Sequence, residues 1–103
     1  MISVGIVEDN QFIRMALEQI ILASEGYELK GSYASGEEAI EKIPFTQPDI
    51  VLMDINLGGM SGIEVVAALH HECPDTRFMM CTVYEDDEKI FEALAAGASG
   101  YIL

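Results

Sequence analysis

An apolar run near the middle of this 103-residue chain reads Ile50-Val51-Leu52-Met53-Asp54. Four apolar side chains in a row, with Pro48 before them and glycines soon after, predict a strand that is buried on both faces. A charge inside such a strand is costly unless it is paired. We therefore expect Asp54 at the carboxyl end of the strand, facing the crevice where open α/β sheets bind ligands.

Predicted strands and helices alternate along the rest of the chain. Apolar or alternating segments predict strands at residues 2–7, 27–34, 48–54, 76–82 and 99–103. Helices are predicted at residues 11–24, from a capping box at Ser35 to Pro44, from a second box at Ser61 to Cys73-Pro74, and from residue 85 to Gly97. This order predicts an α/β fold with a parallel sheet, formed as one domain over residues 1–103.

The composition excludes several classes of function. The formal net charge is −13, from 18 acidic and 5 basic residues, which argues against direct contact with nucleic acid or docking on an anionic membrane. Neither an 18-residue apolar segment nor a signal peptide is evident. Two cysteines, Cys73 and Cys81, are too few for a disulfide framework. We expect them to be reduced thiols of a cytoplasmic protein.

Polar side chains follow three of the predicted strands. Glu8-Asp9, Asp54 and Thr82 stand at the carboxyl ends of the first, third and fourth strands. If these strands are adjacent, the side chains share one pocket. Three carboxylates repel one another, and a hard cation such as Mg²⁺ would relieve that repulsion. A strand-end Asp beside Mg²⁺ is also a plausible phosphoryl acceptor, although each of these acids alone is more often a helix cap or a loop residue.

Several segments together resemble the receiver domain of bacterial two-component response regulators. They are residues 7–10, 49–55 and 60–62, the strand ending at Thr82, and residues 97–103. The last of these is similar to receivers coupled to LuxR/NarL-type helix-turn-helix effectors. The resemblance implies a flavodoxin-like, doubly wound sheet of five parallel strands in the order 2-1-3-4-5.

The resemblance also implies a role for particular residues. Asp54 would be phosphorylated by a sensor histidine kinase. Mg²⁺ would be bound by Asp9, Asp54 and the backbone carbonyl of Asn56, with Glu8 contributing through water. Thr82 and Tyr101 would form the conformational switch. The domain would not be an enzyme beyond slow self-catalysed phosphoryl transfer and dephosphorylation, and it would reach DNA only through a separate effector domain.

The chain departs from the family pattern at four places. The family lysine and the fifth helix would follow Leu103, Gly58 stands where proline is common, Val83 stands where a smaller residue is usual, and Glu8 replaces a frequent Asp. Without the lysine we expect weaker phosphorylation. Without the fifth helix we expect an exposed apolar patch and a homodimer or domain-swapped oligomer.

Two other functions fit these residues less well, and a third stays open. An Asp-x-Asp phosphatase needs a second acid two residues after the nucleophile, and Asn56 cannot transfer a proton. A flavodoxin-like cofactor binder needs a phosphate-cradling loop after the first strand, where Glu8-Asp9 would repel phosphate. A protein-interaction module that is not phosphorylated stays open as an alternative.

Overall fold

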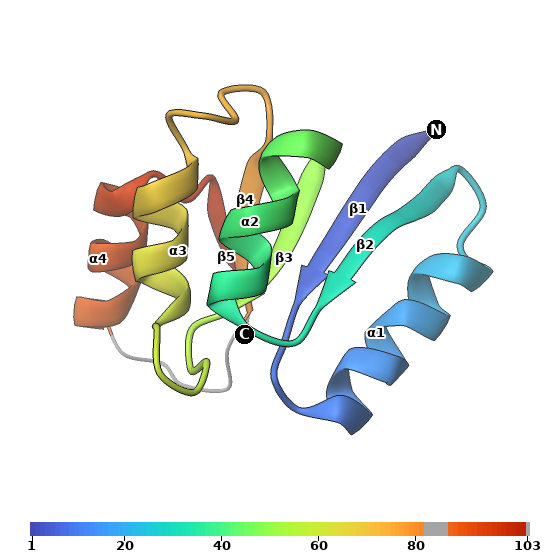
Figure 1. Cartoon of the computed structure of the whole chain (residues 1–103), viewed down its shortest axis with the longest axis horizontal. Coiled ribbons are helices and arrows are strands. Elements are labelled where there is room, and N and C mark those ends of the chain that lie inside the picture. The colour runs from blue at the N-terminus through green and yellow to red at the C-terminus, as the bar shows by residue number, and fades with distance from the viewer. Residues whose placement is uncertain (82–86, 103) are drawn as a thin grey trace.

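The computed structural model describes residues 1–81 and 87–102, in which strands and helices alternate (Figure 1). The elements are β1 Ile2–Val7, α1 Gln11–Ala23, β2 Tyr27–Tyr33, α2 Gly36–Thr46, β3 Ile50–Asp54, α3 Gly62–Leu69, β4 Arg77–Cys81, α4 Asp87–Ala96 and β5 Gly100–Ile102. The strands are parallel, in the order β2-β1-β3-β4-β5. The predicted α/β class is confirmed, and β1, β3 and β4 are neighbours.

The main core lies between the sheet and helices α2, α3 and α4 (Figure 1). Alternate side chains of β3 and β4 point into it, and those of Met53, Phe78 and Met80 are fully buried. The helices contribute Ile43 from α2 and Leu69 from α3. This packing holds the carboxyl ends of β1 and β3 in fixed register, with Val7 opposite Met53.

Two predicted helix ends are wrong. Pro44 lies inside α2 rather than closing it. In the last turn of a helix a proline removes one hydrogen bond without stopping the chain, and α2 ends only where Gln47 takes a left-handed conformation (φ 41°). Helix α3 ends at Leu69, four residues before the predicted end at Cys73.

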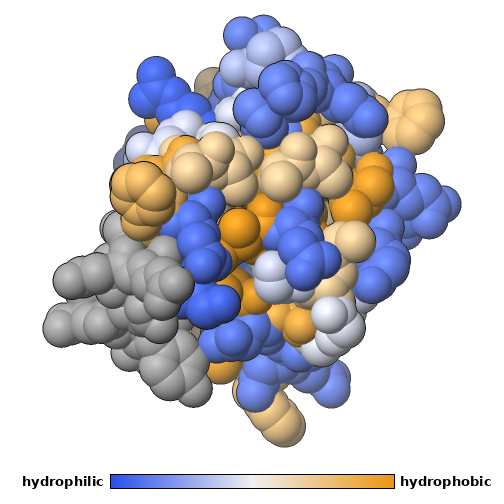
Figure 2. Space-filling view, turned by 90° about the vertical axis from the view of Figure 1, so that its left-hand side faces the viewer, coloured by the Kyte–Doolittle hydropathy of each residue, from blue (hydrophilic) through white to orange (hydrophobic). Residues whose placement is uncertain are grey.

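The side of the molecule formed by α3 and α4 mixes hydrophobic and hydrophilic side chains (Figure 2). Phe91 and Leu94 are exposed apolar residues of α4, and the acidic residue Glu92 lies between them in sequence. Across the described ranges, no helix combines the length and the apolar character needed to cross a membrane.

Helix α1 packs on β1 and β2 but contributes no fully buried residue. Leu17 and Ile21, from the predicted apolar stripe, are half-buried against the sheet. The helix also exposes five large apolar side chains: Phe12, Ile13, Met15, Ile20 and Leu22. The predicted apolar patch beside the missing fifth helix and the predicted self-association both stay predictions.

We expect the 103-residue chain to self-associate at micromolar concentration through α1, because burying these side chains removes apolar surface from water. Ile20→Glu should weaken association by about tenfold. The control is Phe45→Glu, because Phe45 is equally apolar and 87% exposed but belongs to α2. Sedimentation velocity measures the effect, and a monomer for the unsubstituted chain would contradict it.

Candidate functional site

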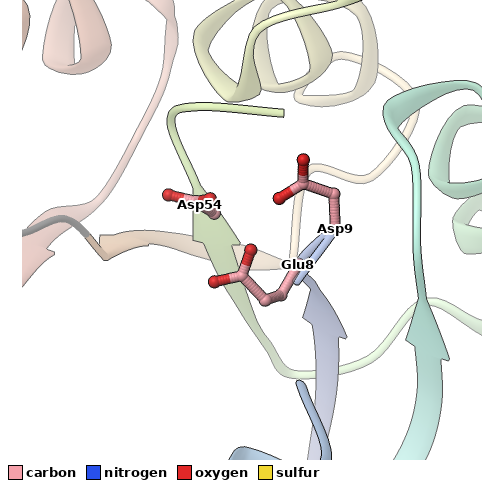
Figure 3. Close-up of side chains that lie close together, drawn as sticks. All are labelled: Glu8, Asp9 and Asp54. Carbon is pink, nitrogen blue, oxygen red and sulfur yellow. The ribbon is translucent and has the colours of Figure 1, made fainter. Parts of the chain in front are cut away.

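Three carboxylates meet at the carboxyl edge of the sheet. Glu8 and Asp9 directly follow β1, and Asp54 is the last residue of the neighbouring strand β3. One carboxylate oxygen from each lies within 4.8 Å of the others. Figure 3 shows the three side chains extending from the ends of the two strands into a common space. The structure therefore brings together the three acids that the sequence predicted to share one pocket.

Neighbouring residues cap the helices and leave these carboxylates available. The Asn10 side-chain oxygen accepts hydrogen bonds from the N–H groups of Phe12 and Ile13, at 2.9 and 3.1 Å. Asn10 is thus the N-cap of α1, a role that the sequence left open between Asp9 and Asn10. Ser61 caps α3 by accepting the Glu64 N–H at 3.2 Å. Neither Asp9 nor Asp54 is needed as a helix cap.

Each carboxylate accepts one backbone N–H group. Asn10 donates to Oε2 of Glu8 at 3.3 Å, and Asn56 donates to Oδ1 of Asp54 at 3.3 Å. The third bond, from Gly58 to Oδ2 of Asp9 at 3.2 Å, crosses from the β3–α3 loop to the β1–α1 loop. Among the described residues, the backbone therefore holds one oxygen of each of the three side chains.

Arg14 is a basic residue that contacts this edge of the sheet, and it was not among the residues predicted for the site. Its Nη1 donates to the backbone carbonyl of Glu8 at 2.9 Å, so α1 is tied to the end of β1. No local sequence pattern indicates this contact, because it depends on how α1 packs against the end of β1. Within residues 1–81 and 87–102, no Lys or Arg side chain forms an ion pair with the three carboxylates.

Burial, together with the hydrogen bond to Asp54 and the negative charge of Asp54, raises the pKa of Glu8 from 4.5 to about 7. Glu8 is only 7% exposed, whereas Asp54 is half-buried and Asp9 is exposed. The cluster therefore retains a proton near neutral pH when no cation neutralises it. Clustered carboxylate oxygens with unbalanced charge fit a hard divalent cation such as Mg²⁺.

Cys81 lies beside the site. From the sequence it was predicted only to be a reduced thiol. It is the register partner of Asp54 at the end of β4. Burial, followed by the charge of Asp54, raises the pKa of its thiol to about 11. The thiol is therefore protonated at neutral pH and is a poor nucleophile.

The remaining predicted site residues are placed only in part. Asn56 is exposed and approaches Asp54 through its N–H group. Thr82 lies outside the described residues. Tyr101 pairs with Met80 as part of β5, but its side chain is outside what the structure describes. The predicted switch therefore stays a prediction.

We expect Glu8→Gln to stabilise the metal-free protein at pH 8 and to have little effect near pH 5. Because the pKa of Glu8 is raised in the folded protein, the protonated carboxyl group stabilises the fold. This contribution is complete below about pH 4.5 and is lost as the pH rises through about 7. The free energy of unfolding of Glu8→Gln, relative to that of the unsubstituted protein, should be about 2 kcal/mol higher at pH 8 than at pH 5. Urea unfolding of both proteins at the two pH values measures it, and a pH-independent difference would contradict the assignment.

Comparison with known proteins agrees with this geometry. Residues 4–103 match the family model of the response regulator receiver domain. The chain belongs to this family. The receiver domain is 33% identical to the DNA-binding transcriptional activator DevR/DosR of Mycobacterium tuberculosis. The match extends over all 103 residues of this chain and over 48% of the relative. It spans about half the length of the curated relatives it matches.

Solved structures share the receiver fold closely. A LuxR-family two-component response regulator from Aurantimonas sp. SI85-9A1 is 30% identical, with a TM-score of 0.90 over 96% of this chain and 71% of that one. A chain of the CheX-CheY-BeF3-Mg²⁺ complex from Borrelia burgdorferi is 30% identical, with a TM-score of 0.87 over 99% of this chain and 77% of that one. These likenesses extend over nearly the whole receiver domain.

Proposed function

We propose that this receiver domain accepts a phosphoryl group on Asp54 and thereby switches the output of a longer response regulator. The observation that carries the proposal is the convergence of Glu8, Asp9 and Asp54 within 4.8 Å at the carboxyl edge of the sheet. Asp54 ends its strand half-buried, so its carboxylate is held in place yet accessible to a donor.

The proposed reaction is a transfer between two proteins. An Asp54 carboxylate oxygen attacks the phosphorus of a phosphohistidine on a sensor kinase. The new O–P bond forms as the N–P bond breaks, and the imidazole nitrogen leaves with the electron pair. The product is an acyl phosphate, which water later hydrolyses to restore the carboxylate. The domain is then a phosphoryl carrier with slow self-catalysed turnover, rather than an enzyme acting on a separate substrate.

Mg²⁺ fits the residues that are present. Asp9 and Asp54 would hold the ion, together with the backbone carbonyl of Asn56, and Glu8 would contribute through water. When bound, the ion supplies positive charge that offsets the negative charge of the phosphoryl oxygens. The complex CheX-CheY-BeF3-Mg²⁺, which contains a structural relative, supports this choice of cation.

The output proposed is control of transcription in the cytoplasm. DevR/DosR is named as a DNA-binding transcriptional activator, and the Aurantimonas relative belongs to the LuxR family. With a net charge of −13, the receiver domain itself is poorly suited to contact DNA. DNA binding would therefore belong to an effector domain, with the phosphoryl group on Asp54 setting its activity.

The test is to incubate the chain with a small-molecule phosphodonor and Mg²⁺ and to measure intact mass. We expect the addition of one phosphoryl group, its loss under hydroxylamine, which cleaves acyl phosphates, and little addition when Mg²⁺ is chelated. An unchanged mass under all conditions would contradict the proposal and favour the alternative of an interaction module that is not phosphorylated.

A further inference from the structure

Asp9 is the least constrained of the three carboxylates. Its side chain is exposed, whereas that of Glu8 is buried and that of Asp54 is half-buried. The hydrogen bonds of Glu8 and Asp54 come from residues two positions further along the chain. Asp9 is held instead by Gly58, which is 49 residues away in sequence. Within the described residues, this contact is the backbone hydrogen bond to the Asp9 carboxylate, and it comes from the β3–α3 loop.

We propose that the Gly58 N–H group is a positioning group that pre-sets Asp9 for Mg²⁺ and couples the metal site to the β3–α3 loop. An exposed aspartate loses side-chain freedom when it binds a cation. A backbone donor that has already restricted the side chain reduces that loss. The inference rests on the proposed Mg²⁺ site. It adds that Gly58, a residue without a side chain, contributes to the affinity of this site for Mg²⁺.

The identity of residue 58 matters through its backbone. A Cβ added at Gly58 would approach Oδ2 of Asp9 at 3.7 Å, an ordinary contact, so alanine fits and keeps the N–H donor. Proline has no N–H and places a ring carbon where the hydrogen was. Comparison of Gly58→Ala with Gly58→Pro therefore isolates the donor from the effect of adding a side chain.

The primary test is the Mg²⁺ dissociation constant, measured by isothermal titration calorimetry on the unsubstituted chain, Gly58→Ala and Gly58→Pro. We expect Gly58→Ala to bind within about twofold of the unsubstituted chain and Gly58→Pro to bind about two- to tenfold more weakly than Gly58→Ala. Equal or tighter binding by Gly58→Pro would overturn this inference alone. Absence of saturable binding in the unsubstituted chain would overturn the proposed metal site and this inference with it.

A second measurement leaves residue 58 unchanged, so it does not depend on how the proline variant folds. In ¹⁵N-labelled protein without metal, the Gly58 amide proton should move upfield in Asp9→Ala, because its acceptor is gone. Adding Mg²⁺ should shift the same resonance in the unsubstituted chain and much less in Asp9→Ala. A Gly58 resonance that is insensitive both to Asp9→Ala and to Mg²⁺ would overturn the coupling.

Discussion

Asp54→Asn is expected to reduce phosphoryl incorporation to background, a loss of at least about 100-fold. The amide nitrogen and oxygen of asparagine are much weaker nucleophiles than a carboxylate, so no acyl phosphate forms at this position. The substituted side chain would still fit at the end of β3 and accept the Asn56 N–H through its amide oxygen, as Asp54 does at 3.3 Å. Intact-mass measurement after phosphodonor treatment gives the result.

Asp75→Asn is the matched control for Asp54→Asn. Asp75 is an exposed carboxylate in the loop before β4, at the opposite end of the sheet from the site. The same change of charge there should leave incorporation within about twofold of the unsubstituted chain. A phosphoryl group that still appears in Asp54→Asn would show that another residue is the acceptor. Far-ultraviolet circular dichroism of both variants checks that their fold is intact.

The sequence predicted the convergence of Glu8, Asp9 and Asp54, because these acids follow strands directly. In a parallel sheet the carboxyl ends of adjacent strands share one edge, so the apolar run ending at Asp54 and the run before Glu8 sufficed to place both acids there. The two capping serines were equally clear, and both Ser35 and Ser61 cap helices as predicted. These features depend on local patterns of a few residues.

What the sequence did not reveal depends on tertiary geometry. No local pattern indicated that the Gly58 N–H group would bind Asp9, or that Arg14 would reach the Glu8 carbonyl. The raised pKa of Glu8 likewise follows from its burial beside Asp54, which only the packed sheet defines. The helix end predicted at Pro44 failed for a related reason. The tertiary packing of α2, including the buried Ile43, outweighs the hydrogen bond that a proline removes.

Gly62→Ala is expected to destabilise the domain by about 3 kcal/mol, at the upper end of the cost of overpacking. Gly62 begins α3, and its N–H group donates to the Ile55 carbonyl at 2.8 Å, which folds the loop back onto the end of β3. A Cβ at this position would lie 2.0 Å from the backbone oxygen of Asp54. Because that oxygen belongs to a strand fixed in the sheet, the loop must move. Urea or thermal unfolding measures the loss of stability.

The displacement should also reach the proposed metal site, because the moving loop carries Asn56 and Gly58, the donors to Asp54 and Asp9. Gly62→Ala should therefore weaken Mg²⁺ binding under conditions where the variant remains folded. Gly58→Ala is the control for stability, because its added Cβ meets only an ordinary contact at 3.7 Å. If Gly62→Ala proved as stable as Gly58→Ala, the close approach of α3 to β3 would be wrong.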